Sequence, residues 1–130
     1  MLIVSSNYKN MFLASLLLIF PAFAQEGGML KDLAIPLMEG LEENNDGAML
    51  FDSPEGRIIN AEAGGIISGS DIYNYYRVVL PSLGWNVESP ATCEENVSFC
   101  IRAIRDEESL QLNIMVAGKG SSVTYALAPN

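Results

Sequence analysis

The sequence predicts an α+β domain with two layers, in which a curved antiparallel sheet packs on one helix and the elements follow the order ββαββββ. Three observations predict it. Segments in which apolar and polar residues alternate, as in half-buried strands, dominate the chain after residue 84. One segment, 72–80, has helical spacing of its apolar residues instead. Short turns separate the strands, and short turns join antiparallel neighbours.

The first 24 residues have the pattern of a secretory signal peptide. Lys9 carries the only charge before an apolar run at 11–20, which is too short to span a membrane. Ala22 and Ala24 are small residues at the two positions that a signal peptidase reads. We therefore expect cleavage after Ala24 and a single exported domain over 25–130, with no stable membrane insertion after cleavage.

Residues 25–46 are expected to form an extended lead-in to this domain. Pro36 and Gly40 disfavour a long helix there. Leu33, Ile35 and Leu37 alternate with their neighbours, and a sheet edge tolerates proline, so a short edge strand is an option. The segment 42–47 is expected to be a polar turn.

A first hairpin is predicted from two strands, 48–51 and 57–63, around a turn at 52–56. Pro54 presets φ and Gly56 accepts a positive φ, so the chain reverses between them. On the returning strand, Ile59, Ala61 and Ala63 share one face.

One helix is predicted over 72–80. Ser70 is the expected N-cap, and Asp71 lies where the helix dipole favours an acid. Pro81 limits the helix and Gly84 supplies a left-handed stop. The apolar stripe consists of Ile72, Tyr75, Tyr76, Val79 and Leu83.

Four strands are predicted after the helix, at 85–88, 97–105, 110–116 and 123–127. One helix of about three turns covers only part of a six-stranded sheet, so strong curvature or a partner is expected to cover the rest. A closed barrel is the alternative.

Cys93 and Cys100 are the only cysteines. In an oxidising compartment we expect them to pair as a structural disulfide. A redox-active pair would favour a C-x-x-C spacing at a helix start, which this sequence lacks.

Charge and composition exclude several classes of function. Residues 25–130 carry six basic and sixteen acidic side chains, a net charge of −10, which repels nucleic acid and anionic lipid. The chain has no histidine, which removes Ser-His and Cys-His catalysis and most zinc sites. Adjacent acids lie in predicted turns, where water solvates them. The segment from Glu42 to Gly47 resembles half of a calcium loop, but the twelfth position is Ser53. We expect no catalytic residues, no cofactor and no metal.

Aromatic residues gather on the predicted helix and just beyond it, at Tyr73, Tyr75, Tyr76 and Trp85. They are the candidate residues for a ligand groove between helix and sheet, because such side chains combine contact area with a polar tip. The alternative is core packing for Tyr76 and Trp85, with Tyr73 partly exposed.

Three segments, 52–59 (DSPEGRII), 80–85 (LPSLGW) and 127–129 (LAP), resemble an uncharacterised family of small exported proteobacterial proteins with a Leu-Pro-x-x-Gly-Trp signature. The resemblance covers about 33–129. It implies a Gram-negative periplasm and attaches no activity to the fold. The cysteine pair is not part of that pattern.

Two functions are expected from these observations. The first is a non-enzymatic periplasmic binding or accessory protein that engages an envelope protein through a sheet face or edge. The alternative is a carrier that holds a small apolar ligand or a lipid between helix and sheet.

Overall fold

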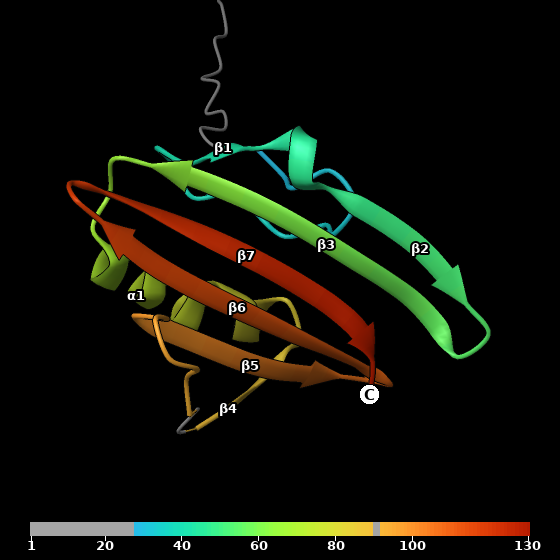
Figure 1. Cartoon of the computed structure of the whole chain (residues 1–130). Helices are drawn as coiled ribbons and strands as arrows, with labels where there is room; N and C mark the ends of the chain where they lie inside the picture. Colours follow the sequence, from blue (N-terminus) through green and yellow to red (C-terminus); the bar gives the residue numbers. More distant parts are fainter. Residues whose placement is uncertain (1–27, 90–91) are drawn as a thin grey trace, which may run out of the picture.

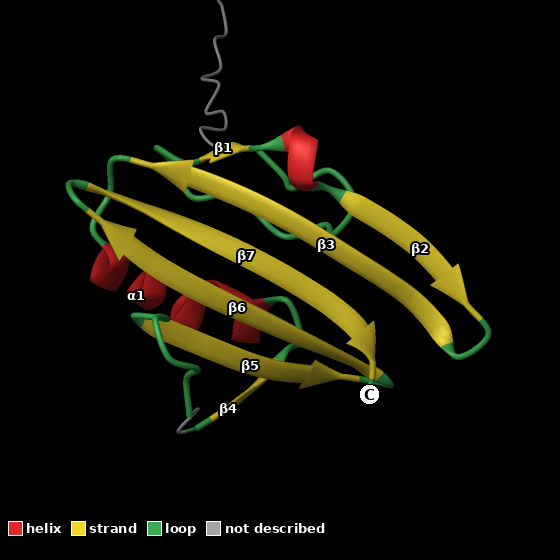
Figure 2. Cartoon of the chain, in the orientation of Figure 1, coloured by secondary structure: helices red, strands yellow, loops and turns green. Residues whose placement is uncertain are grey.

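The computed structural model of the chain describes residues 28–89 and 92–130, so the predicted signal peptide lies outside the described residues. Within them, one α-helix packs on a seven-stranded antiparallel sheet, which confirms the predicted α+β fold (Figure 1, Figure 2). The elements are β1 (Glu42–Glu43), a 3-10 turn (Asn45–Gly47), β2 (Met49–Ser53), β3 (Gly56–Gly65), α1 (Gly69–Ser82), β4 (Asn86–Glu88), β5 (Phe99–Arg105), β6 (Glu108–Ala117) and β7 (Gly120–Pro129).

The sheet is open, with the strand order β1-β3-β7-β6-β5-β4, and β2 pairs with β3 beside β1. The chain therefore does not form the barrel that the sequence left as an alternative. Strands β5, β6 and β7 form a meander of short turns, and β7 then pairs with β3. The last strand of the chain thus lies in the middle of the sheet (Figure 1).

Helix α1 begins earlier than predicted, because Ser68 is its N-cap in place of Ser70. The Ser68 hydroxyl accepts a hydrogen bond from the backbone N–H of Asp71 at 3.1 Å. Gly69 then lies so close to the sheet that a Cβ there would lie 2.6 Å from Cγ2 of Val116. Pro81 lies within the last turn of the helix, and Gly84 has the expected positive φ of 91°.

The lead-in differs most from expectation. Leu33 to Leu37 form no edge strand; the chain turns at 31–33 and Ala34 has a φ of 56°. The turn is closed by the backbone N–H of Leu30, which donates to the carbonyl of Ile35 at 2.9 Å. Met29 and Pro36 form an isolated antiparallel bridge beside this turn, so the segment pairs with itself and joins no strand of the sheet. The expected polar turn at 42–47 is instead β1, which pairs with β3, followed by the 3-10 turn.

The core lies on one face of the sheet, under two covers. Helix α1 packs on β5, β6 and β7 and buries Ile72, Tyr76 and Leu80. The lead-in is the second cover and buries Leu30, Leu33, Ile35 and Leu41 in the same apolar cluster. The part of the sheet that one helix cannot cover is thus covered by the chain itself.

The two covers are linked through buried tyrosines. The hydroxyl of Tyr76, from α1, donates to the carbonyl of Pro36 in the lead-in at 2.9 Å. The same oxygen lies 2.8 Å from the hydroxyl of Tyr125 on β7, which is therefore the donor in that second bond. Burial raises the pKa of Tyr76 to about 12 and raises that of Tyr125 further, so both remain neutral donors at ordinary pH.

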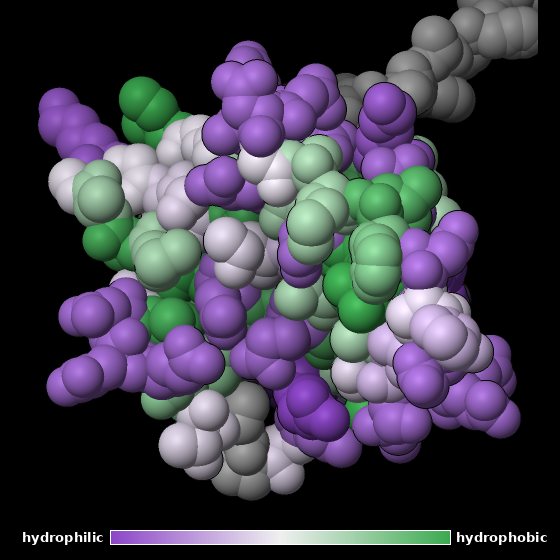
Figure 3. Space-filling view, turned by 45° about the vertical axis from the view of Figure 1, so that its right-hand side comes forward, coloured by the Kyte–Doolittle hydropathy of each residue, from purple (hydrophilic) through white to green (hydrophobic). Residues whose placement is uncertain are grey.

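The opposite face of the sheet is largely polar. Its residues alternate with the core residues along each strand and include Asn60, Gln111, Asn113 and Thr124, all partly exposed. Gln111 donates to the side-chain oxygen of Asn113 at 3.1 Å. In the view of Figure 3 hydrophilic residues predominate, and apolar residues form smaller patches between them. A broad apolar docking surface is therefore not built from these strands.

Candidate functional site

The four aromatic residues singled out from the sequence do not line one groove. Tyr76 and Trp85 are 0 % and 3 % exposed and belong to the core. Tyr75 is half-buried with its ring edge against Tyr76, at a centroid distance of 4.9 Å. Tyr73 stacks on Phe99 of β5 at 5.4 Å. Tyr73 and Tyr75 are about 200° apart around the helix, so they face different surroundings.

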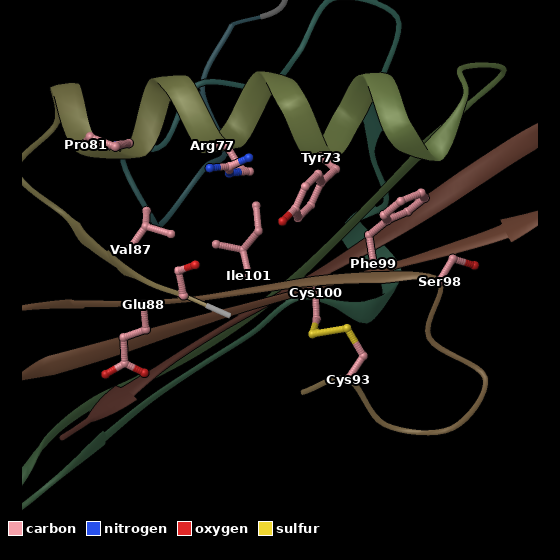
Figure 4. Close-up of a pocket in the computed structure, with 11 residues that line it drawn as sticks. Tyr73, Arg77, Pro81, Val87, Glu88, Cys93, Ser98, Phe99, Cys100 and Ile101 are labelled. Carbon is pink, nitrogen blue, oxygen red and sulfur yellow. A yellow bond between two sulfur atoms is a disulfide. The ribbon is translucent and has the colours of Figure 1, made fainter. Parts of the chain in front are cut away.

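A cavity of about 560 Å³ lies between α1 and β5 and includes Tyr73 (Figure 4). It lies beside the part of β5 that β4 does not pair with, because the β4–β5 ladder ends at the pair Glu88–Arg102. Its apolar lining comes from Tyr73, Pro81, Val87, Phe99 and Ile101. Its polar lining comes from Arg77, Glu88, Ser89 and Ser98.

The predicted disulfide is present and borders this cavity. Cys93 and Cys100 are bonded, with their Cα atoms 5.6 Å apart. Cys100 belongs to β5, whereas Cys93 belongs to the loop that leads from β4 to β5. In Figure 4 the bridge lies on the side of β5 away from α1. The disulfide therefore fixes the loop beside the cavity opening.

Arg77 carries the positive charge of the cavity. Its guanidinium carbon lies 5.5 Å from the centre of the Tyr73 ring, a cation–π contact, because residues four apart are neighbours on a helix. Within the described part of the chain, Arg77 forms no salt bridge. Glu88, the acid among the described lining residues, is paired with Arg102 at 3.1 Å. Figure 4 shows Glu88 pointing away from the helix, whereas Arg77 extends from α1 toward Ile101.

Of the four predicted groove residues, only Tyr73 lines this cavity. Cys93 and Cys100 line it as well, although they were predicted for a structural disulfide and not for a binding site. Arg77 could have been found from its i, i+4 spacing to Tyr73. No local pattern indicates that Val87 and Ile101 meet beneath it, because β4 and β5 come together only through the sheet register.

The Gly-Trp end of the helix has a structural role. The guanidinium of Arg105 lies 4.3 Å from the centre of the Trp85 ring and donates to the carbonyl of Leu83 at 3.0 Å. Trp85 is thereby held within the core cluster. Its indole N–H is buried without a hydrogen-bond partner in the described residues.

A second feature is the edge strand β2. It pairs only with β3, and its apolar residues are unusually accessible: Met49, Leu50 and Phe51 are 50 %, 56 % and 55 % exposed. Acidic residues flank it, with Asp46 before the strand, Asp52 within it and Glu55 in the following turn. The bidentate contact between Arg57 and Glu108, at 2.8 and 3.2 Å, holds the turn end of this hairpin to the start of β6.

Over 28–89 and 92–130 no group of three or more His, Cys, Asp or Glu side chains is arranged to hold a metal ion. The turn acids Glu94, Glu95, Asp106 and Glu107 are exposed. No helix among the described residues is long and apolar enough to cross a membrane.

Comparison with protein-family models, curated proteins and solved structures found no match. The resemblance to small exported proteobacterial proteins therefore stays a prediction from the sequence segments alone.

Proposed function

We propose that the chain is a non-enzymatic periplasmic accessory protein that binds an envelope protein through the edge strand β2. The exposed apolar edge carries the proposal. An unpaired edge strand offers free backbone donors and acceptors to another chain, and proteins usually guard such edges with lysine, proline or bulges. Here Met49, Leu50 and Phe51 occupy the edge, and the strand contains no lysine or proline. Localisation is supported by the signal-peptide pattern and the disulfide.

The charges around β2 define the kind of partner. Asp46, Asp52 and Glu55 would repel the same edge of a second copy, as would the net charge of −9 on the whole chain. An extended segment with apolar residues in its middle and basic residues at its ends complements both features. Added as an antiparallel or parallel strand, such a segment would gain backbone hydrogen bonds from the edge and specificity from alternate side chains.

The test uses the processed, oxidised protein as bait against a detergent-solubilised envelope extract of the source organism. Two baits with equal added charge are compared with the unmodified protein. Leu50→Lys places the charge on β2, whereas Val78→Lys places it on the outer side of α1, where Val78 is 74 % exposed.

One stoichiometric protein that the unmodified bait and Val78→Lys retain, and Leu50→Lys loses, is the expected result. Its basic-flanked extended segment, made as a peptide, should then bind the purified protein directly. Equal retention by all three baits would place the interface elsewhere, and no retained protein at all would refute the accessory function.

The alternative, a carrier of a small ligand, is favoured by one observation, the cavity beneath α1. Its volume of about 560 Å³ lies within the range of ligand pockets, about 300–1,000 Å³. The residues that support this alternative are those of the cavity, with Tyr73 the member of the predicted groove that lines it.

A further inference from the structure

We propose that the cavity between α1 and β5 binds a single-chain amphiphile with an oxyanion head group, such as a medium-chain fatty acid, with the head on Arg77. The inference rests on the carrier alternative and specifies its ligand. It is independent of the edge strand β2, which contributes no residue to the cavity.

The shape and lining of the cavity suit an alkyl chain. Val87, Phe99 and Ile101 form an apolar surface that comes from two strands and faces the helix (Figure 4). Its lining extends from Pro81 in the last turn of α1 to Ser98, which immediately precedes β5. Burial of an apolar tail there is favourable in proportion to the area removed from water.

The charge at the cavity selects the head group. The chain has seven basic and sixteen acidic residues, so its overall field repels anions. Arg77 is nevertheless directed toward the cavity without an acidic partner among the described residues, since Glu88 is engaged by Arg102. A guanidinium offers paired donors that match carboxylate or phosphate oxygens, and its contact with the Tyr73 ring helps to orient it.

An extended peptide fits this site poorly. Strand addition to β5 would require the edge beside Cys100, and Cys93 is bonded there with a Cα–Cα distance of 5.6 Å, similar to the spacing of neighbouring strands. The disulfide therefore occupies the position that an added strand would take. A ligand without a backbone needs no such pairing and can lie between α1 and β5.

The experiment is isothermal titration calorimetry of the processed, oxidised protein with decanoate, decyl phosphate, decanol and decyltrimethylammonium, each below its critical micelle concentration. The four share one alkyl chain and differ in head group. We expect decanoate or decyl phosphate to bind at least about tenfold more tightly than decanol, as a charged hydrogen bond predicts, and the cation to bind most weakly. The stronger of the two anions shows whether the natural source is a free fatty acid or a lipid phosphate.

Two variants of equal charge change test the role of Arg77. Arg77→Gln should weaken binding of the anions about tenfold and leave decanol unchanged. Lys119→Gln, in the turn between β6 and β7 outside the cavity, should leave all four ligands unchanged. Thermal unfolding of each variant checks that its fold is intact.

The outcomes separate the inference from the carrier alternative on which it rests. Equal binding of decanol and decanoate, unaffected by Arg77→Gln, would overturn the head-group assignment and leave a carrier of neutral ligands. Equal weakening by Lys119→Gln would show a general charge effect and also overturn it. Absence of binding by all four ligands would refute both the inference and the carrier.

Discussion

Replacing Tyr76 by Phe removes one oxygen from the middle of a chain of two hydrogen bonds. That oxygen donates to the carbonyl of Pro36 and accepts from the hydroxyl of Tyr125. Without it, the fully buried Tyr125 hydroxyl has no partner among its described neighbours. Replacing Tyr125 instead leaves the Tyr76 hydroxyl donating to Pro36, so the two single variants are unequal although each removes one oxygen.

The magnitudes follow from the cost of an unsatisfied buried group. Tyr125→Phe loses one hydrogen bond and should lower the free energy of unfolding by about 1 kcal/mol. Tyr76→Phe loses two bonds and isolates a buried hydroxyl, so it should cost about 2–4 kcal/mol. The double variant isolates no hydroxyl and should cost about 2 kcal/mol, less than the sum of the two single variants.

Urea unfolding, followed by circular dichroism, measures these differences, and thermal unfolding should shift by about 4–8 °C per kcal/mol. Limited proteolysis within the lead-in provides a local readout, since the Tyr76 hydroxyl is one of its attachments to the helix. Equal costs for the two single variants, or strict additivity in the double variant, would refute the directed chain of bonds.

The same tyrosines predict alkaline sensitivity. The pKa of Tyr76 is raised by burial from about 10 in the unfolded chain to about 12, so folding favours the neutral phenol. The stabilisation is complete below pH 10 and is lost as the pH rises toward and through 12. Stability measured from pH 8 to 11.5 should therefore fall more steeply in the unmodified protein than in the double Phe variant; parallel curves would contradict this assignment.

Three further predictions concern single contacts. Replacing both cysteines by Ser should cost about 2–3 kcal/mol on the chain-entropy model and weaken decanoate binding, measured by urea unfolding and calorimetry; unchanged affinity would mean that the loop does not shape the cavity. Arg57→Gln should cost less than about 1 kcal/mol near neutral pH because the pair is partly exposed. The hydrogen bond from Arg57 lowers the pKa of Glu108 in the folded state. The stabilisation from this pair is therefore present above the unfolded pKa of Glu108 and is lost as the pH falls through the lowered folded pKa. In the variant, the free energy of unfolding should lack this loss when it is measured over the same acid range. Ser68→Ala should cost about 1 kcal/mol by loss of the N-cap, whereas Ser70→Ala should cost much less, and the reverse order in thermal unfolding would contradict the observed cap.

The strands were predictable because their signals are local. The alternation of Leu110, Leu112 and Ile114 places them on one face whatever their partners are, and the structure buries all three. The helix centre was equally clear, but its start was not. Ser68 and Ser70 are chemically alike, and the choice between them depends on the close approach of Gly69 to Val116 and Phe99, which only the packed sheet defines.

The lead-in and the cavity could not be predicted from local sequence patterns either, because they also depend on how the chain packs. The inward direction of Leu30 and Leu33 depends on a turn with a positive φ at Ala34, a residue type that gives no warning of it. The aromatic pattern correctly indicated a concentration of rings on α1. It could not indicate that Tyr76 would be enclosed by the lead-in while Tyr73 remained beside a cavity, because both are tyrosines on one helix.

The position of β7 determines when this protein can fold. The last strand in the sequence, β7 (Gly120–Pro129), is central in the sheet. It lies between β3 and β6 and pairs with both, so these two strands are joined only through β7. A growing chain therefore exposes the apolar residues of its lead-in and first hairpin until its final segment arrives, since the pairing of β3 with β7 spans most of the domain. During that interval the chain is open to chaperones and to aggregation through its unpaired strands. Removal of β7 would therefore take away the strand that joins β3 to β6.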